Sequence, residues 1–244
     1  MSREERSGRG RSPHSVATQV YDRVRQGGER YWSLSDLSDL SATAVAHALS
    51  RLASAGELQR VRKGVYYRSK PTAIGPSGPS GSAVVAKTAR GPLHPSGLTA
   101  GSVLGLSTQN PAWPEFATPG PTGPVALGGA TVHTRRPASR ASLDVSDGAL
   151  LELLRDRARY SDLPPEETAD RLIRMLADGK RFERLAKAAL DEPPRVRAML
   201  GALGERAQAP AKALQALRAS LNPLTKFDFG VLQALPNAKD WQAR

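Results

Sequence analysis

The sequence predicts an α+β protein, in which an N-terminal winged helix-turn-helix domain precedes a mixed domain with a small β-sheet and a helical C-terminal part. Residues 14–70 contain three segments with helical periodicity followed by a basic hairpin. Residues 111–140 alternate short apolar runs with Gly and Pro, as small sheets do. From residue 148 onward the apolar residues recur at helical spacing, and 244 residues suffice for two domains.

The first helix is expected to begin at His14 and to end at the Gly27-Gly28 pair. Its apolar positions, at helical spacing, are Val16, Val20 and Val24. A short extended step at residues 31–32 leads to Ser33, a favourable N-cap for a second helix rich in leucine. The aspartates of this second helix, Asp36 and Asp39, are expected on its solvated outer face.

Ser41 is expected to cap the third helix, which is the candidate recognition helix of the helix-turn-helix pair. Its apolar residues follow the i, i+3, i+4, i+7 pattern, and Gly56 ends it. The opposite face carries mostly short side chains, which allow a close approach to DNA but provide few bidentate donors. The candidate DNA-contacting residues of this helix are Thr43, His47, Ser50 and Arg51.

Residues 58–61 and 65–67 alternate as two short strands, with Arg62-Lys63-Gly64 as the turn between them. The glycine supplies the positive φ that a tight hairpin needs. Several cations crowd this hairpin, and their mutual repulsion would be relieved beside a phosphate backbone. The alternative is a solvated face with no partner. The candidate phosphate contacts are Arg60, Arg62, Lys63 and Arg68.

The composition fits a polyanionic partner. The formal net charge is +12, and residues 1–70 hold 13 Lys and Arg against 7 Asp and Glu. A chain rich in Ala and Arg can also be basic for compositional reasons alone. The absence of cysteine excludes disulfides, Cys-ligated zinc and thiol nucleophiles, and suits a reducing cytoplasm. No apolar run approaches the roughly 18 residues of a membrane span, so we expect a cytoplasmic protein without membrane contact.

The remaining boundaries follow from composition. Residues 1–13 are expected to form a disordered basic tail, and residues 71–82, PTAIGPSGPSGS, a linker before a C-terminal domain at residues 83–244. Helices are predicted around residues 82–89 and 99–104. Three short strands of an antiparallel sheet are predicted at residues 115–118, 125–127 and 131–134. Five helical patterns follow, and prolines at 164, 165, 193, 194 and 210 indicate helix starts.

No catalytic or cofactor motif is found. The sequence lacks GxxxxGK[ST], GxGxxG and HExxH, and its four histidines share no motif. We therefore expect no enzyme activity, no cofactor and no metal ligand. Carboxylates far apart in sequence can nevertheless meet in a fold, so a nuclease acting on bound DNA stays open as an alternative.

A second basic cluster follows the last predicted strand. One interpretation is a second contact with DNA or RNA. The other is a set of surface charges that pair with Asp144, Asp147 or Glu152. The cluster consists of Arg135, Arg136 and Arg140.

Three segments, in this order and spacing, resemble the AbiEi family of bacterial antitoxins. They are ALSRLASAGELQRVRKGVYYRSK, PSGLTAGSVLGLSTQNPAWPEFATPG and VHTRR. The resemblance covers about residues 15–140, with a weaker likeness in NPLTKFDFGVLQALP. It implies a winged-helix domain followed by a larger antitoxin domain, in type IV toxin-antitoxin systems linked to abortive infection by phage.

The resemblance also implies partners and site residues. The functional partner would be a nucleotidyltransferase-like toxin, opposed without a stable complex, and the antitoxin would repress its own operon by binding inverted repeats in double-stranded DNA. By position it implies DNA contacts from the candidate residues of the third helix and from Arg62 and Lys63. It leaves Arg135 and Arg136, beside Arg140, as candidates for the antitoxin surface.

The leading hypothesis from the sequence is a DNA-binding autorepressor that is also a type IV antitoxin. The alternative is a winged-helix regulator without a toxin partner, in which the C-terminal domain serves dimerisation or sensing.

Overall fold

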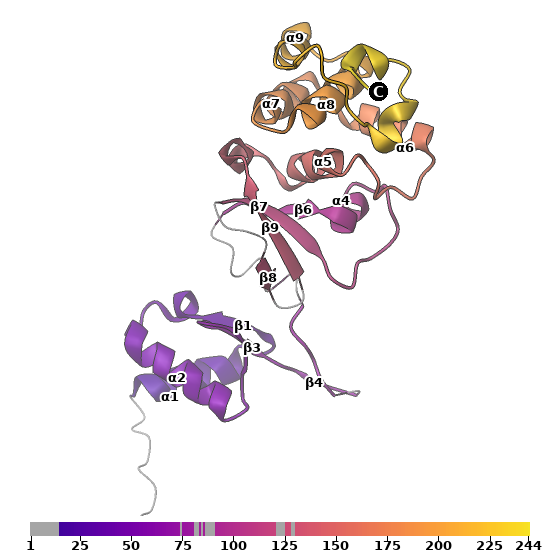
Figure 1. Cartoon of the computed structure of the whole chain (residues 1–244). Helices are drawn as coiled ribbons and strands as arrows, with labels where there is room; N and C mark the ends of the chain where they lie inside the picture. Colours follow the sequence, from indigo (N-terminus) through magenta and orange to yellow (C-terminus); the bar gives the residue numbers. More distant parts are fainter. Residues whose placement is uncertain are drawn as a thin grey trace, which may run out of the picture. The chain divides into compact units, whose positions relative to one another are not determined.

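The structure is a computed structural model that describes residues 15–73, 75–80, 83, 85, 91–120, 125–127 and 130–244. The chain divides into two compact units, Met1–Thr88 and Ala89–Arg244 (Figure 1). Each unit combines helices with strands, which confirms the predicted α+β class. The predicted tail at residues 1–13 and most of the predicted helix at residues 82–89 lie outside the described residues.

The first unit has the element order of a winged helix. Ser15 caps the first helix by accepting a hydrogen bond from the Thr18 amide at 3.2 Å. Val20 and Val24 of this helix pack against the apolar side of the second α-helix. The strands form one antiparallel sheet in the order β1-β3-β2. The elements are α1 (Val16–Gln26), β1 (Arg30–Ser33), the 3₁₀ turn η1 (Leu34–Leu37), α2 (Ala42–Ser54), β2 (Gln59–Arg62) and β3 (Val65–Arg68).

The predicted second helix is shorter than expected, because η1 is a single 3₁₀ turn. The carboxylate of Asp36 accepts hydrogen bonds from the amide of Ser33 at 2.8 Å and from its hydroxyl at 2.7 Å. Asp36 also pairs with Arg30 at 3.0 Å, and Asp39 pairs with Arg23 at 2.6 Å. The expectation that both aspartates simply face solvent was therefore wrong for Asp36, whose side chain is only 10% exposed.

Part of the predicted linker is ordered against the first unit. The antiparallel strands β4 (Pro71–Thr72) and β5 (Gly75–Pro76) form a small hairpin within it. Beyond this hairpin, the Tyr31 hydroxyl donates to the carbonyl oxygen of Ser80 at 3.0 Å, and the Tyr67 hydroxyl lies 3.0 Å from the Ser77 hydroxyl. These two tyrosines from adjacent strands attach the segment as far as Ser80.

The sheet of the second unit is mixed, whereas the sequence predicted an antiparallel one. Its strand order is β6-β7-β9-β8, and β7 and β9 are parallel. β8 forms a hairpin with β9 instead of pairing with β7, which places β9 between them. The strands are β6 (His94–Ser96), β7 (Glu115–Pro119), β8 (Val125–Leu127) and β9 (Ala130–Arg136). β6 was not predicted, because three residues that include a proline carry no strand pattern.

The helices of the second unit lie in layers beside this sheet (Figure 1). α5 contacts β6 and α4 on one side and α8 on the other, and α9 packs on α7 and α8. The helices are α4 (Gly97–Val103), α5 (Val145–Arg155), α6 (Pro165–Met175), α7 (Gly179–Ala189), α8 (Pro194–Arg206) and α9 (Ala211–Ala219), with 3₁₀ turns η2 (Ala138–Ser142), η3 (Gly230–Ala234) and η4 (Lys239–Trp241). Prolines stand at the predicted starts of α6, α8 and α9.

The C-terminal segment closes the helical core. Trp241 is 1% exposed and packs so closely on α8 that a Cβ atom at Gly201 would lie 2.1 Å from its ring. Its indole nitrogen donates to Glu205 at 2.9 Å, and the guanidinium of Arg218 lies 4.3 Å from the ring centre. This packing fixes the C-terminal turns on α8.

In the part of the chain that the structure describes, every helix is too short or too polar to cross a membrane.

Candidate nucleic-acid interface

α2 separates its buried side from an accessible polar side. Val45, Leu49 and Leu52 are at most 5% exposed and contribute to the core of the first unit. The four predicted contact residues of this helix are all exposed: Thr43, His47, Ser50 and Arg51. The helical periodicity of the sequence thus correctly placed them away from the core.

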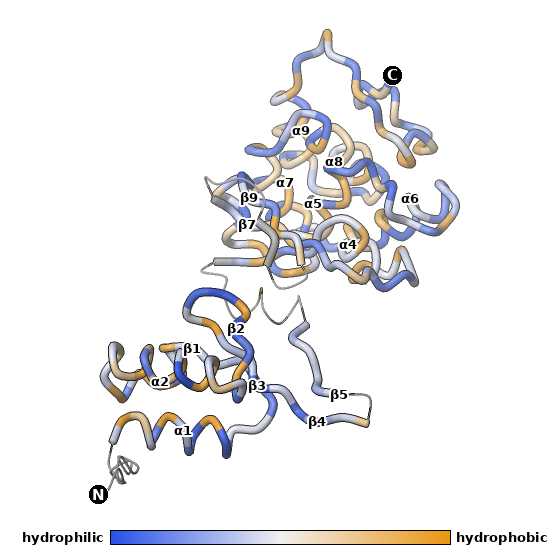
Figure 2. The backbone as a smooth tube through the Cα atoms, turned by 60° about the horizontal axis from the view of Figure 1, so that its bottom comes forward, coloured by the Kyte–Doolittle hydropathy of each residue, from blue (hydrophilic) through white to orange (hydrophobic). Residues whose placement is uncertain are grey.

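The hairpin beside α2 has a two-residue turn. Arg62 pairs with Val65, so Lys63 and Gly64 form the turn, and Gly64 has a φ of 78°. The strand pairing shifts between Arg60 and Arg62, which makes Val61 the extra residue of a β-bulge. The tube of Figure 2 is mostly hydrophilic at this hairpin. Arg60, Arg62 and Lys63 are all exposed.

The cations of the first unit differ in whether the fold provides a partner for them. Arg23 and Arg30 are held by the ion pairs with Asp39 and Asp36. By contrast, within the described residues, four cations of α2 and the hairpin take part in no hydrogen bond or ion pair; they are Arg51, Arg60, Arg62 and Lys63. Unpaired positive charge therefore gathers on α2 and the adjacent hairpin, where it is free to meet an anionic partner.

Arg68 does not belong to this group, and its prediction as a phosphate contact needs correction. It is half-buried, and its guanidinium donates to the carbonyl oxygens of Val24, at 2.7 Å, and Arg25. The last carbonyls of a helix lack partners within the helix, and a basic side chain can satisfy them. Arg68 therefore caps the C-terminus of α1.

The basic cluster of the second unit is largely internal. Arg136 donates through Nε to Glu152 at 2.7 Å and through Nη2 to the other oxygen at 2.8 Å. Arg140 is 0% exposed and binds both Glu152 and Glu192, the latter at 2.5 Å. The prediction of a surface role was therefore wrong for Arg140, and for Arg136 the ion-pairing alternative holds. Arg135 is exposed.

Glu152 is the centre of this network. Burial by itself raises the pKa of Glu152, but the hydrogen bond from Arg136 and the charges of Arg140 and Arg136 outweigh burial and lower the pKa to about 2. Ser96 adds a hydrogen bond to the same carboxylate at 2.8 Å. Glu152 is thus ionised, and its single negative charge is shared by Arg136 and Arg140.

Two members of the network were missed in the sequence. Arg155 donates through Nε to Glu192 at 2.7 Å, across 37 positions of sequence. Neither residue lies in a motif, so only their meeting in the fold reveals them.

The other two acidic candidates, Asp144 and Asp147, have different partners. Asp144 caps α5, and Asp147 binds Arg181 at 2.7 Å as well as Arg184.

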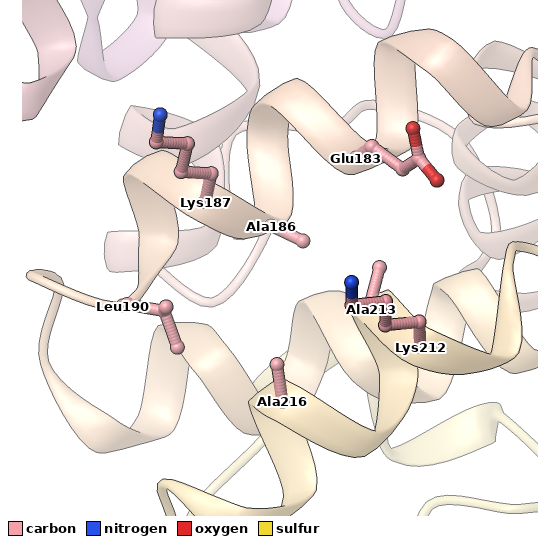
Figure 3. A pocket seen from close by; sticks show the side chains of 7 residues that line it. All are labelled: Glu183, Ala186, Lys187, Leu190, Lys212, Ala213 and Ala216. Atoms are coloured by element: carbon pink, nitrogen blue, oxygen red, sulfur yellow. The ribbon is translucent and has the colours of Figure 1, made fainter.

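Two surface cavities can be described among the residues of the second unit that the structure describes. One, of about 340 Å³, lies between α7 and α9 and is lined by three alanines and Leu190 together with Glu183 and two lysines (Figure 3). Its alanines, Ala186, Ala213 and Ala216, face the space between the helices. The other, of about 570 Å³, is lined by Arg135, Arg136 and Arg155, among others. Among the described residues, no group of three His, Asp or Glu side chains is arranged to hold a metal ion.

Comparison with known proteins gives a fold relative and a family. Curated proteins yielded no match to this chain. The crystal structure of the RV2827C protein from Mycobacterium tuberculosis is similar with a TM-score of 0.51 and 16% sequence identity, over 87% of this chain and 84% of that chain. This is a likeness of fold. The family of unknown function DUF6088 matches residues 33–154, which run from the end of β1 through α2, the hairpin and the sheet to α5. The chain belongs to the family of unknown function DUF6088.

Proposed function

We propose that this protein is a DNA-binding transcriptional autorepressor and the antitoxin of a type IV toxin-antitoxin pair. The observation that carries the DNA-binding part is the group of unpaired cations on the β2–β3 hairpin and α2, beside the exposed polar face of that helix. The antitoxin part rests on the three sequence segments that resemble AbiEi antitoxins. The proposal assigns the chain no catalytic activity.

The two parts of this surface, α2 and the β2–β3 hairpin, would make different contacts with duplex DNA. α2 would enter the major groove, where Thr43, His47 and Ser50 allow a close approach to the base edges. Arg62 and Lys63 would bind the adjacent phosphates, which sets the position of the helix without reading sequence. Binding would therefore combine a large salt-dependent term from the hairpin with a smaller sequence-dependent term from α2.

Replacing Arg62 or Lys63 by Ala is expected to weaken binding to every duplex sequence. Each lost phosphate contact should reduce the slope of log affinity against log salt by about one unit. The measurement is a mobility-shift titration at several salt concentrations with the promoter fragment upstream of the gene. Arg25→Ala is the matched control, because Arg25 is equally exposed but lies on α1. Unchanged affinity in both hairpin variants would remove the hairpin from the interface.

The double substitution Thr43→Ala with His47→Ala is expected to reduce discrimination between the operator and random duplex. A lost base contact is worth about 1–3 kcal/mol of discrimination. Affinities for both duplexes, measured under the same salt conditions, give the ratio directly. An equal loss on both duplexes would mean that this face of α2 reads no bases.

The antitoxin part is tested in cells. Expression of the gene adjacent to this one is expected to arrest growth, and co-expression of this chain is expected to restore it. The variant that carries both Arg62→Ala and Lys63→Ala, expressed from a constitutive promoter, is expected to restore growth as well, because neutralising the toxin would not require binding to the operator. A harmless neighbouring gene would instead support the alternative of a regulator without a toxin, while leaving the DNA-binding measurements unaffected.

A further inference from the structure

The second unit holds more positive than negative charge around its larger cavity. Arg136, Arg140 and Arg155 share only two carboxylates, those of Glu152 and Glu192. Each of the four carboxylate oxygens already accepts a hydrogen bond from an arginine. These five residues therefore carry a net charge of +1.

Donors of this network remain unused. Arg155 donates a hydrogen bond to Glu192 through Nε alone. Within the described residues its two terminal nitrogens have no partner, and its side chain is 22% exposed. Nη2 of Arg140 is buried and has no partner. An unpaired buried donor is unfavourable. Arg140 is not among the residues that line the cavity, so it adds positive charge behind the wall and not a contact to a ligand.

The cavity places these charges within reach of a ligand. Its volume is about 570 Å³, and its walls include the side chains of Arg135, Arg136 and Arg155. Arg135 is exposed, within the described residues it has no side-chain partner, and its backbone has a φ of 61°. A non-glycine residue in this conformation is strained, and such strain is concentrated at functional sites. The remaining walls are Pro137, Ala138, Asp191, Glu192 and Pro193.

The titration of Arg155 agrees with an excess of positive charge. Burial lowers the pKa of Arg155, and the charges of Arg136 and Arg140 lower it further, while Glu192 opposes them. An anion in the cavity would relieve this repulsion.

We propose that this cavity binds a phosphate group, through Arg135 and the free terminal nitrogens of Arg155, with Arg136 adding positive charge. A planar guanidinium fork matches the geometry of phosphate oxygens. None of the described residues that line the cavity is aromatic and could stack on a base, so the ligand is recognised by its phosphate. Asp191, exposed in the same wall, opposes the anion and limits its affinity. The residues of this site belong to the second unit, and none of them is part of the DNA-binding surface proposed for the first unit.

The test is calorimetric titration of the full chain with inorganic phosphate and with pyrophosphate, in chloride buffer at constant ionic strength. We expect one saturable site, weakened at least about tenfold by Arg135→Ala, because a hydrogen bond to a charged group is lost. Asp191→Asn should strengthen binding several-fold by removing a like charge. The matched control is Arg206→Ala, an exposed arginine at the opposite end of α8, which should change nothing.

Two further experiments, one with another variant and one with another ligand, complete the test. Arg155→Lys preserves the charge and the contact to Glu192 but removes the guanidinium fork, so it should weaken binding while circular dichroism confirms the fold. A single-stranded oligonucleotide, titrated into the chain carrying Arg62→Ala and Lys63→Ala, identifies the source of the phosphate. The site is assigned to a nucleic-acid backbone if the oligonucleotide binds, Arg135→Ala abolishes that binding, and free phosphate does not bind. Absence of saturable binding in both arms, or equal loss in the Arg206 control, would overturn the proposal.

Discussion

Glu152→Gln is expected to destabilise the second unit by about 3–5 kcal/mol, the usual cost of removing one partner from a buried ion pair. The substitution preserves the size of the side chain but leaves Arg136 and the fully buried Arg140 without their shared negative charge. Urea unfolding followed by circular dichroism measures the free energy of unfolding.

The matched control is Glu167→Gln. Glu167 pairs with Arg171 at 3.5 Å on the surface of α6, where such a pair contributes less than about 0.5 kcal/mol. If the two substitutions had the same small effect, the network around Glu152 would not stabilise the fold.

The same carboxylate predicts a dependence of stability on pH. The pKa of Glu152 is lowered from its ordinary value of 4.5 to about 2 in the folded chain. Its contribution is therefore fully present above pH 4.5 and is lost as the pH falls from 4.5 toward 2, by about 3 kcal/mol in total. The free energy of unfolding of the wild type should decrease more steeply over this interval than that of Glu152→Gln.

Trp241→Ala is expected to cost about 3–5 kcal/mol, as large aromatic truncations in a core do. The side chain is 1% exposed, and its removal leaves a cavity against Gly201 of α8 and takes one of the hydrogen bonds from the Glu205 carboxylate. Thermal unfolding followed by near-ultraviolet circular dichroism reports this loss.

Trp113→Ala provides the control for the same residue type. The Trp113 side chain is 67% exposed, so its replacement should change the stability by no more than about 0.5 kcal/mol. A small effect at both tryptophans would show that the C-terminal segment does not stabilise the core.

Helical periodicity and turn-forming residues were sufficient to predict most helices and the hairpin of the first unit. Val45, Leu49 and Leu52 follow the helical pattern, so the sequence placed α2 and its exposed face correctly. Gly64 marked the turn of the hairpin. The parallel pairing of β7 with β9 was not predictable, because strand order depends on which edge each short strand meets in space.

The sequence by itself determined most of the helices, where the basic hairpin turns and which side of α2 avoids the core, because these follow from local periodicity and backbone preference. Only the tertiary structure decided which arginines are free. Arg68 and Arg140 look like Arg62 in the sequence, but the fold brings helix carbonyls to the first and two carboxylates to the second. A positive charge is available to a partner only where the fold provides no acceptor for it, and those acceptors lie far away in the sequence.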